Sequence, residues 1–185
     1  MDPERSPDER SPDELRVLAR TIVDENRFMT LATADADGRP WASPVWYAPA
    51  GEREFYWVSS PEARHSRNLA VRAELSIVIF DSHRTGGWAA VYLAGVAEEL
   101  EDVDEGIAIF TERSVAQGFP PWTREDVLPP ARHRLYRATI RERFVLDPHD
   151  RRLPVTFGEG PPATEGKTPK RMPGSSSGGT RTVRG

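Results

Sequence analysis

Three apolar segments separated by two short turns are what most restricts how this 185-residue chain can fold. The first segment, residues 28–33, is followed by ADADGR, whose Asp37-Gly38 pair is typical of a β-hairpin. The second, residues 41–48, leads through PAGERE to a third that begins at Phe55. Strands joined by such short connections run antiparallel. The sequence therefore predicts an antiparallel meander, and Pro44 predicts that its second strand is an edge strand or locally irregular.

Helices are predicted on both sides of this meander. Ser11 and Glu14 have capping-box spacing around Pro12, which predicts a helix to about Glu25. Ser60 followed by Pro61 predicts a second helix start. Further along, the apolar patterns predict strands at 75–80, 88–100, 132–141 and 144–146, helices at 61–72 and 102–118, and one helical turn within PPWTREDVLPP.

The two ends of the chain differ in composition from its middle. The N-terminus is acidic with little that is apolar, and the C-terminal region is rich in Pro, Gly, Ser and Thr. Such segments cannot bury enough apolar surface to fold. The expected organisation is a disordered N-terminus (1–10), one domain (11–157) and a disordered tail (158–185).

Composition excludes several classes of chemistry. The chain has no Cys, which excludes disulfides, thiolate metal sites and cysteine catalysis. Its four His lack metal-ligand spacing, so no metal is expected, and neither a GxSxG nor a Walker A motif occurs. The formal net charge of -4 gives no support for a nucleic-acid or membrane partner, and no apolar run is long enough to span a bilayer. We expect a cytoplasmic protein whose reactive atoms, if it is an enzyme, belong to a bound cofactor.

The segment FYWVSSPEARHSRN, residues 55–68, is the strongest candidate for a binding site. Phe55 and Trp57 are expected on one strand face, and Tyr56 and Val58 on the other. Two hydroxyls and several cations follow where the helix begins, and a helix start offers unpaired N–H groups and the positive end of its dipole. This arrangement suits a phosphate group. The alternative is an ordinary strand-to-helix junction with a solvated basic face.

Three segments in this order, ASPVWY (42–47), FYWVSSPEARHSRNL (55–69) and AVYLAGVAEEL (90–100), resemble the pyridoxamine 5'-phosphate oxidase-like family of flavin-binding split barrels. The resemblance covers roughly residues 15–146. It implies a mainly β (α+β) fold, a six-stranded antiparallel split β-barrel with peripheral helices, which forms a homodimer with FMN at its interface. Family members include oxidases, FMN- or deazaflavin-dependent reductases, haem-degrading proteins and flavin binders. The resemblance therefore defines the site better than the reaction.

The resemblance assigns cofactor contacts to particular residues. Ser43, Val45 and Trp46 match the strand that lies along the flavin ring, and Trp46 could cover an apolar part of that ring. The alternative for Trp46 is a core or dimer-interface aromatic. Ser59 and Ser60 match the hydroxyl positions near the phosphate.

The following helix carries the candidate phosphate ligands. His65 stands where many relatives have a phosphate-pairing lysine, and Asn68 matches a common asparagine. Arg64 and Arg67 flank His65, and arginine can hold phosphate through two N–H groups. The alternative for the two arginines is a solvated helix face. Because histidine is only partly charged at neutral pH, His65 would be a pH-sensitive ligand.

A second departure from the family lies before residue 90. Relatives often have a flavin-contacting glutamine there, whereas this chain has Ala89 and Ala90, whose side chains cannot hydrogen-bond. The neighbouring Trp88 would stack on the cofactor or fill the interface.

The first hypothesis is an FMN-dependent oxidoreductase that acts on an unidentified small molecule, with no protein acid or base assigned. One alternative is a reductase that uses the deazaflavin coenzyme, held in a groove lined by the arginines of residues 64–72 and the basic tail. Another is a non-catalytic flavin- or haem-binding module, which Ala89 and Ala90 favour. Pyridoxamine phosphate is not the expected substrate, because the family's C-terminal arginine and histidine motif is not found.

Overall fold

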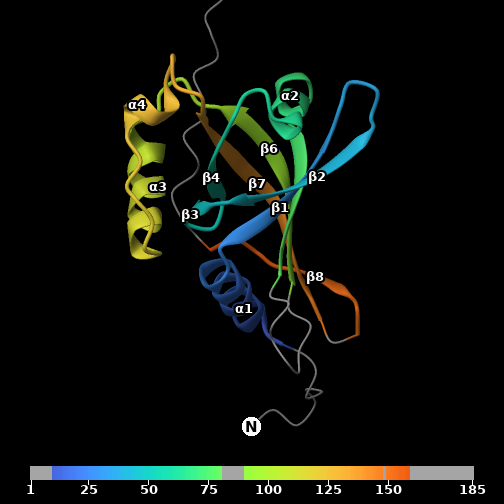
Figure 1. Ribbon diagram of the computed structural model, residues 1–185. Helices are drawn as coiled ribbons and strands as arrows, with labels where there is room; N and C mark the ends of the chain where they lie inside the picture. The colour runs from blue at the N-terminus through green and yellow to red at the C-terminus, as the bar shows by residue number, and fades with distance from the viewer. Residues whose placement is uncertain (1–9, 81–89, 148, 159–185) are drawn as a thin grey trace, which may run out of the picture.

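One curled antiparallel sheet forms the centre of the computed structural model, which describes residues 10–80, 90–147 and 149–158. The sheet runs in the order β2-β1-β5-β6-β7-β4-β3, with β8 added to β7 (Figure 1). The strands are β1 (Phe28–Ala34), β2 (Pro40–Trp46), β3 (Ala48–Ala50), β4 (Glu54–Ser59), β5 (Glu74–Phe80), β6 (Ala90–Glu99), β7 (Arg134–Leu146) and β8 (Arg152–Pro154). The helices are α1 (Pro12–Glu25), α2 (Arg64–Val71), α3 (Asp104–Ala116) and α4 (Arg124–Val127). The predicted mainly β split barrel is confirmed, with eight strands in this part of the chain rather than six.

The strand order requires the sheet to curl into a barrel. β2 and β3 stand at opposite ends of that order, yet Tyr47 alone separates them in the chain. The expected second strand is therefore divided, because β2 pairs with β1 up to Trp46 and β3 pairs with β4 from Ala48. Tyr47 is fully buried at this transition, and its hydroxyl donates to the Val23 carbonyl at 2.7 Å. Since β2 ends the strand order among the described residues, the edge position predicted from Pro44 is confirmed.

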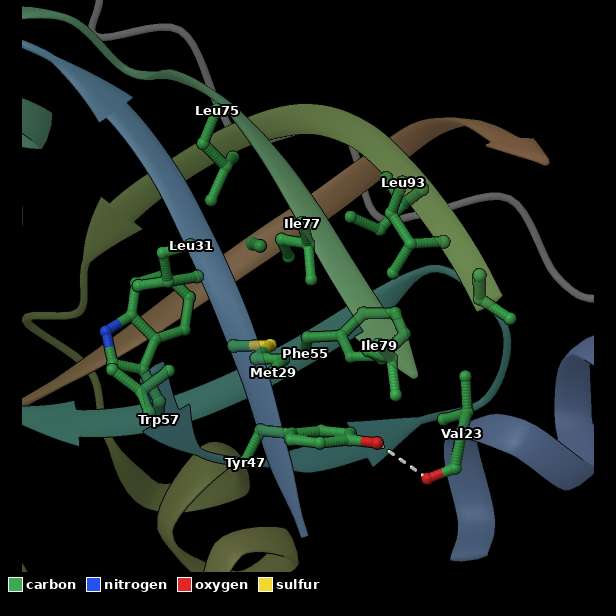
Figure 2. Packing of buried hydrophobic residues seen from close by; sticks show 14 of the residues in the cluster. Val23, Met29, Leu31, Tyr47, Phe55, Trp57, Leu75, Ile77, Ile79 and Leu93 are labelled. Carbon is green, nitrogen blue, oxygen red and sulfur yellow. Dashed lines mark hydrogen bonds between the residues drawn. The ribbon is translucent and has the colours of Figure 1, made fainter. Parts of the chain in front are cut away.

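The inward side chains of the strands fill the barrel (Figure 2). The core residues labelled in Figure 2 include Met29, Leu31, Tyr47, Phe55, Trp57, Leu75, Ile77, Ile79 and Leu93. On β4 the predicted alternation is confirmed, because Phe55 and Trp57 join this core while Tyr56 joins a second cluster beneath α3. β4 is thus shared between two apolar clusters.

α1 and α2 lie at opposite ends of the barrel (Figure 1). The predicted capping box of α1 is confirmed, since Ser11 Oγ accepts from the Glu14 N–H at 3.2 Å and the Ser11 N–H donates to the Glu14 carboxylate at 2.5 Å. One face of α1 then reaches the core through Leu15, Ala19, Ile22 and Val23.

The predicted start of α2 is wrong. The helix begins at Arg64 with Ala63 as its N-cap, rather than at Pro61 after Ser60. Ser60 instead organises a turn, in which its carbonyl accepts from the Ala63 N–H at 3.0 Å and its Oγ from the Glu62 N–H at 3.2 Å. Proline suits the second position of such a turn as well as the first position of a helix, so the Ser-Pro signal fits both.

α3 packs beside β3 and β4 and covers the second cluster (Figure 1). The helix predicted at 102–118 is confirmed, and Ile107, Phe110 and Ser114 form its buried face. Gly106 permits a close approach to β4, since a Cβ atom there would lie 2.7 Å from Cε1 of Tyr56.

Two further predictions concern the second half of the chain. The helical turn in the proline-rich connector is confirmed as α4, but the two closing strands form one continuous strand, β7. Trp88, the N-terminal segment 1–9 and most of the tail, 159–185, lie outside the described residues. No helix in the described ranges is long and apolar enough to cross a membrane.

Candidate functional site

The junction between β4 and α2 brings two of the predicted site residues into contact. His65 Nε2 lies 2.8 Å from Ser59 Oγ, and the His65 side chain is buried. Burial disfavours the imidazolium form and lowers the pKa of His65 below its usual value. The neutral ring therefore holds the Ser59 hydroxyl in place in this structure.

Asn68 lies one turn further along α2 and is also buried. Its Nδ2 donates to Thr33 Oγ1 at 3.0 Å, and the Thr33 hydroxyl donates to the Trp41 carbonyl at 3.4 Å. This chain of hydrogen bonds ties α2 to the β1–β2 hairpin. Asn68 thus holds the helix against the barrel in this structure.

The two arginines of α2 are exposed and have acidic neighbours. The Arg64 guanidinium lies 4.4 Å from the Trp41 ring centroid, and its Nη2 is 4.0 Å from Asp35 Oδ2. Arg67 donates to the Glu62 carbonyl, and its Nη1 is 4.0 Å from the Glu62 carboxylate. Ion pairs this long on an exposed surface are weak, so either guanidinium can turn to another anion at little cost.

The start of α2 has the features of an anion site. Ala63 provides no side-chain cap, and the first turn of α2 carries no acidic residue. The positive end of this eight-residue helix therefore faces the turn that holds Ser60, next to Ser59 and Arg64. These donors fit a phosphate group.

The three predicted residues of β2 lie in different environments. Val45 is buried in the barrel core, and Ser43 is half-buried opposite Leu31. Trp46 packs against α3, where its ring centroid is 4.6 Å from that of Phe110. β2 therefore presents Trp46, rather than Val45, to the space outside the barrel.

An aromatic cavity of about 450 Å³ lies between the barrel and α3. It is lined by Phe28, Trp46, Val58, Phe110, Ser114, Phe119, Pro120, Pro121, Trp122 and Asp126. Val58 directly precedes the two candidate phosphate-site hydroxyls, so the cavity and the α2 junction are neighbouring regions of β4.

Sequence reasoning missed three residues of this region, Thr33, Asp35 and Trp41. All three belong to the β1–β2 hairpin, in which Thr33 pairs directly with Trp41. The Asp37-Gly38 turn predicted that pairing, but nothing in the sequence predicted that α2 would lie against it. No group of three or more potential metal ligands occurs in the described residues.

A curled antiparallel sheet of this strand order, with helices packed at its ends, defines a split β-barrel protein. Residues 17–144 match the family model described as pyridoxamine 5'-phosphate oxidase. The chain belongs to this family, as the resemblance implied.

One curated relative and two solved structures show what the chain is similar to. The chain is 28% identical over 142 residues to a pyridoxine/pyridoxamine 5'-phosphate oxidase of Burkholderia mallei, covering 75% of this chain and 58% of that protein. It is also similar to a haem-binding protein from Mycobacterium smegmatis, with a TM-score of 0.62, 28% identity and coverage of 80% of this chain and 59% of that one. A third similar structure is HutZ, the haem storage protein of Vibrio cholerae, with a TM-score of 0.56, 25% identity and coverage of 71% and 94%.

Proposed function

We propose that this protein is an FMN-dependent oxidoreductase acting on a small molecule. The observation that carries the proposal is the uncapped start of α2, next to the Ser59 and Ser60 hydroxyls and Arg64, on the fold of a family that generally binds flavin. Bound FMN would supply the redox chemistry, and the protein would supply position, phosphate binding and a dry pocket.

The chain's own residues divide this work between two regions. Ser59, Ser60 and the first N–H groups of α2 would bind the phosphate, with Arg64 free to turn toward it. Ser43 and Trp46 would lie along the ring, as would Trp88, which is outside the described residues. The contacts of His65, Arg67 and Asn68 with the cofactor stay predictions, since each is engaged within the protein here.

The partner proposed for this site is a second copy of the chain. Small residues form a row across the outer face of the sheet, because Ala32 pairs with Ser76 and Ser76 with Ala94. A shallow hollow of about 460 Å³ lies over this row. A face of small side chains permits close approach of another sheet, which supports a homodimer through this surface.

The test is a visible absorption spectrum of the purified protein before and after adding FMN and desalting. A retained flavin spectrum is the expected result. A colourless protein after FMN addition contradicts the proposal. A competition titration with the deazaflavin coenzyme then tests whether the exposed Arg64, Arg67 and Arg72 bind its longer acidic tail instead.

Haem binding is a second candidate function, because two of the similar structures are named for haem. A haem site here would need an axial ligand, and His133 is half-buried with its ring 5.7 Å from that of Trp122. A Soret band after haem addition that is lost in His133→Ala would support this candidate over flavin.

A further inference from the structure

We infer that the aromatic cavity between the barrel and α3 binds an uncharged, apolar molecule that contains a ring. If the proposed function is correct, this molecule is the substrate or its apolar part. The role of the ligand as a substrate thus rests on the proposed function, whereas its chemical class is inferred from the cavity alone.

The size and walls of the cavity fit such a ligand. Its volume of about 450 Å³ is within the range of small-molecule sites, roughly 300–1,000 Å³. The Trp46 ring meets Phe110 and Phe119 edge to face at 4.6 and 6.2 Å, and Phe110 meets Trp122 in the same way at 5.8 Å. These contacts hold the rings at steep angles to one another, so that a flat ligand can meet both ring faces and ring edges.

The polar groups in the walls are already engaged. Ser114 Oγ donates to the Pro120 carbonyl at 2.8 Å, and Trp46 Nε1 donates to Gln117 Oε1 at 2.8 Å. The Asp126 carboxylate accepts from the Thr123 N–H at 2.8 Å. A polar ligand would lose its water and find few partners here, which costs free energy, whereas an apolar ligand loses little.

The charge of the walls disfavours anions. Asp126 is the one formally charged residue among those that line the cavity in the described part of the chain. Arg113 is the α3 residue next to Ser114, but its guanidinium donates to the carbonyls of Asp24 and Asn26 at 2.7 and 3.2 Å. Arg27 lies 6.0 Å from the Phe119 ring centroid and does not line the cavity. The cavity therefore suits a ligand without phosphate or carboxylate groups.

The position of the cavity connects it to the proposed cofactor site. Trp46 belongs to both, and Val58 lines the cavity directly before Ser59. A ligand in the cavity would thus lie beside the strand along which the flavin ring is proposed to bind.

The first test measures binding of neutral phenylnaphthylamine, whose fluorescence rises in apolar sites, to the full chain. Phe119→Ala removes a cavity wall that is 45% exposed, so folding is expected to be unaffected. The dissociation constant of phenylnaphthylamine from the Phe119→Ala variant should be about fivefold higher than from the unmodified protein. The matched control is Phe80→Ala, which removes a phenylalanine that is 54% exposed on β5 and outside the cavity. Equal effects of the two substitutions, or no probe binding by the unmodified protein, would overturn the inference.

The second test concerns charge. Anionic anilinonaphthalene sulfonate, a probe with a similar ring system, should bind at least about tenfold more weakly than the neutral probe, and Asp126→Asn should reduce that difference. Equal affinities for the two probes would refute the preference for uncharged ligands.

Parallel FMN titrations separate this inference from the proposed function. Probe binding without FMN retention supports the cavity and contradicts the flavin proposal. FMN retention without probe binding supports the flavin proposal and overturns the cavity inference.

Discussion

His65 Nε2 lies 2.8 Å from Ser59 Oγ, across the junction where β4 leads into α2. The contact joins the last residue of a strand to the second residue of a helix, and it fixes the hydroxyl that is proposed to lie near the cofactor phosphate. Because this imidazole is buried and neutral, the direction in which the stability of the protein changes with pH can be predicted.

The stability of the protein should fall as His65 becomes protonated. Burial lowers the folded-state pKa of His65, so the unfolded chain binds a proton more readily than the folded protein does. The contribution of neutral His65 to the free energy of unfolding is fully present above the pKa of about 6.5 that His65 has in the unfolded chain. It is lost as pH falls through the lower pKa that His65 has in the folded protein. The thermal unfolding temperatures of wild type and His65→Gln should therefore differ most at about pH 8 and least at about pH 5. A difference that grows toward low pH would contradict this assignment.

The proposed phosphate contacts predict a selective loss of FMN affinity in a variant of α2. Arg64→Ala combined with His65→Ala should weaken FMN binding at least about tenfold, because the charged Arg64 guanidinium and the ring that holds Ser59 are both lost. Riboflavin has the same ring without the phosphate, so its affinity should change little. Arg20→Ala, an exposed arginine on α1 at the other end of the barrel, is the matched control. Unchanged FMN affinity in the double variant would remove α2 from the site.

His65 also predicts how FMN affinity depends on pH. If the protonated ring pairs with phosphate, affinity should decline as pH rises through the titration of His65, whose pKa burial has lowered. The phosphate itself gains charge near about pH 6, which acts in the opposite direction. Isothermal titrations of wild type and His65→Gln separate the two effects, since only wild type contains the imidazole. Parallel profiles would show that His65 positions Ser59 and does not bind phosphate.

The outer face of the sheet gives a prediction about assembly. Ala32→Arg places a long cation in the row of small residues and should shift a homodimer to monomer in light-scattering measurements. Ala36→Arg makes the same exchange in the exposed turn of the β1–β2 hairpin and should leave the mass unchanged. A wild-type monomer, or a dimer that tolerates Ala32→Arg, would exclude this face as the interface.

Local patterns in the sequence predicted most of the elements and the family. The capping box of α1, the alternation of β4 and the Asp37-Gly38 hairpin each depend on neighbours within a few residues, and all three are seen in the structure. The Ser60-Pro61 signal failed because a turn and a helix start use the same residue types there.

The arrangement of the site depended on contacts between distant segments. Asn68 donates a hydrogen bond to Thr33, which is 35 residues away in the sequence, and Trp46 donates one to Gln117, which is 71 residues away. The sequence provided the residue types for a phosphate site, but barrel closure at Tyr47 decides that Trp46 faces α3 while Val45 enters the core. Such placements follow from tertiary packing and have no local signature.

Helix propensity and side-chain packing predict opposite effects of Gly106→Ala on the stability of the protein. Alanine is favoured over glycine in a helix by up to about 1 kcal/mol, so propensity alone predicts that Gly106→Ala, at the third residue of α3, stabilises this helix. A Cβ atom at this position would lie 2.7 Å from the Tyr56 ring and 2.9 Å from Leu135 Cδ2, both of which are buried in the second cluster. Such overpacking typically costs about 1–3 kcal/mol, so Gly106→Ala should lower the free energy of unfolding in a urea titration. Ala108→Gly, an exposed position two residues later, should also be destabilising, here by about 1 kcal/mol from propensity. If Gly106→Ala were stabilising, α3 would not pack on β4 as closely as described, and the wall of the aromatic cavity that Phe110 provides would lie elsewhere.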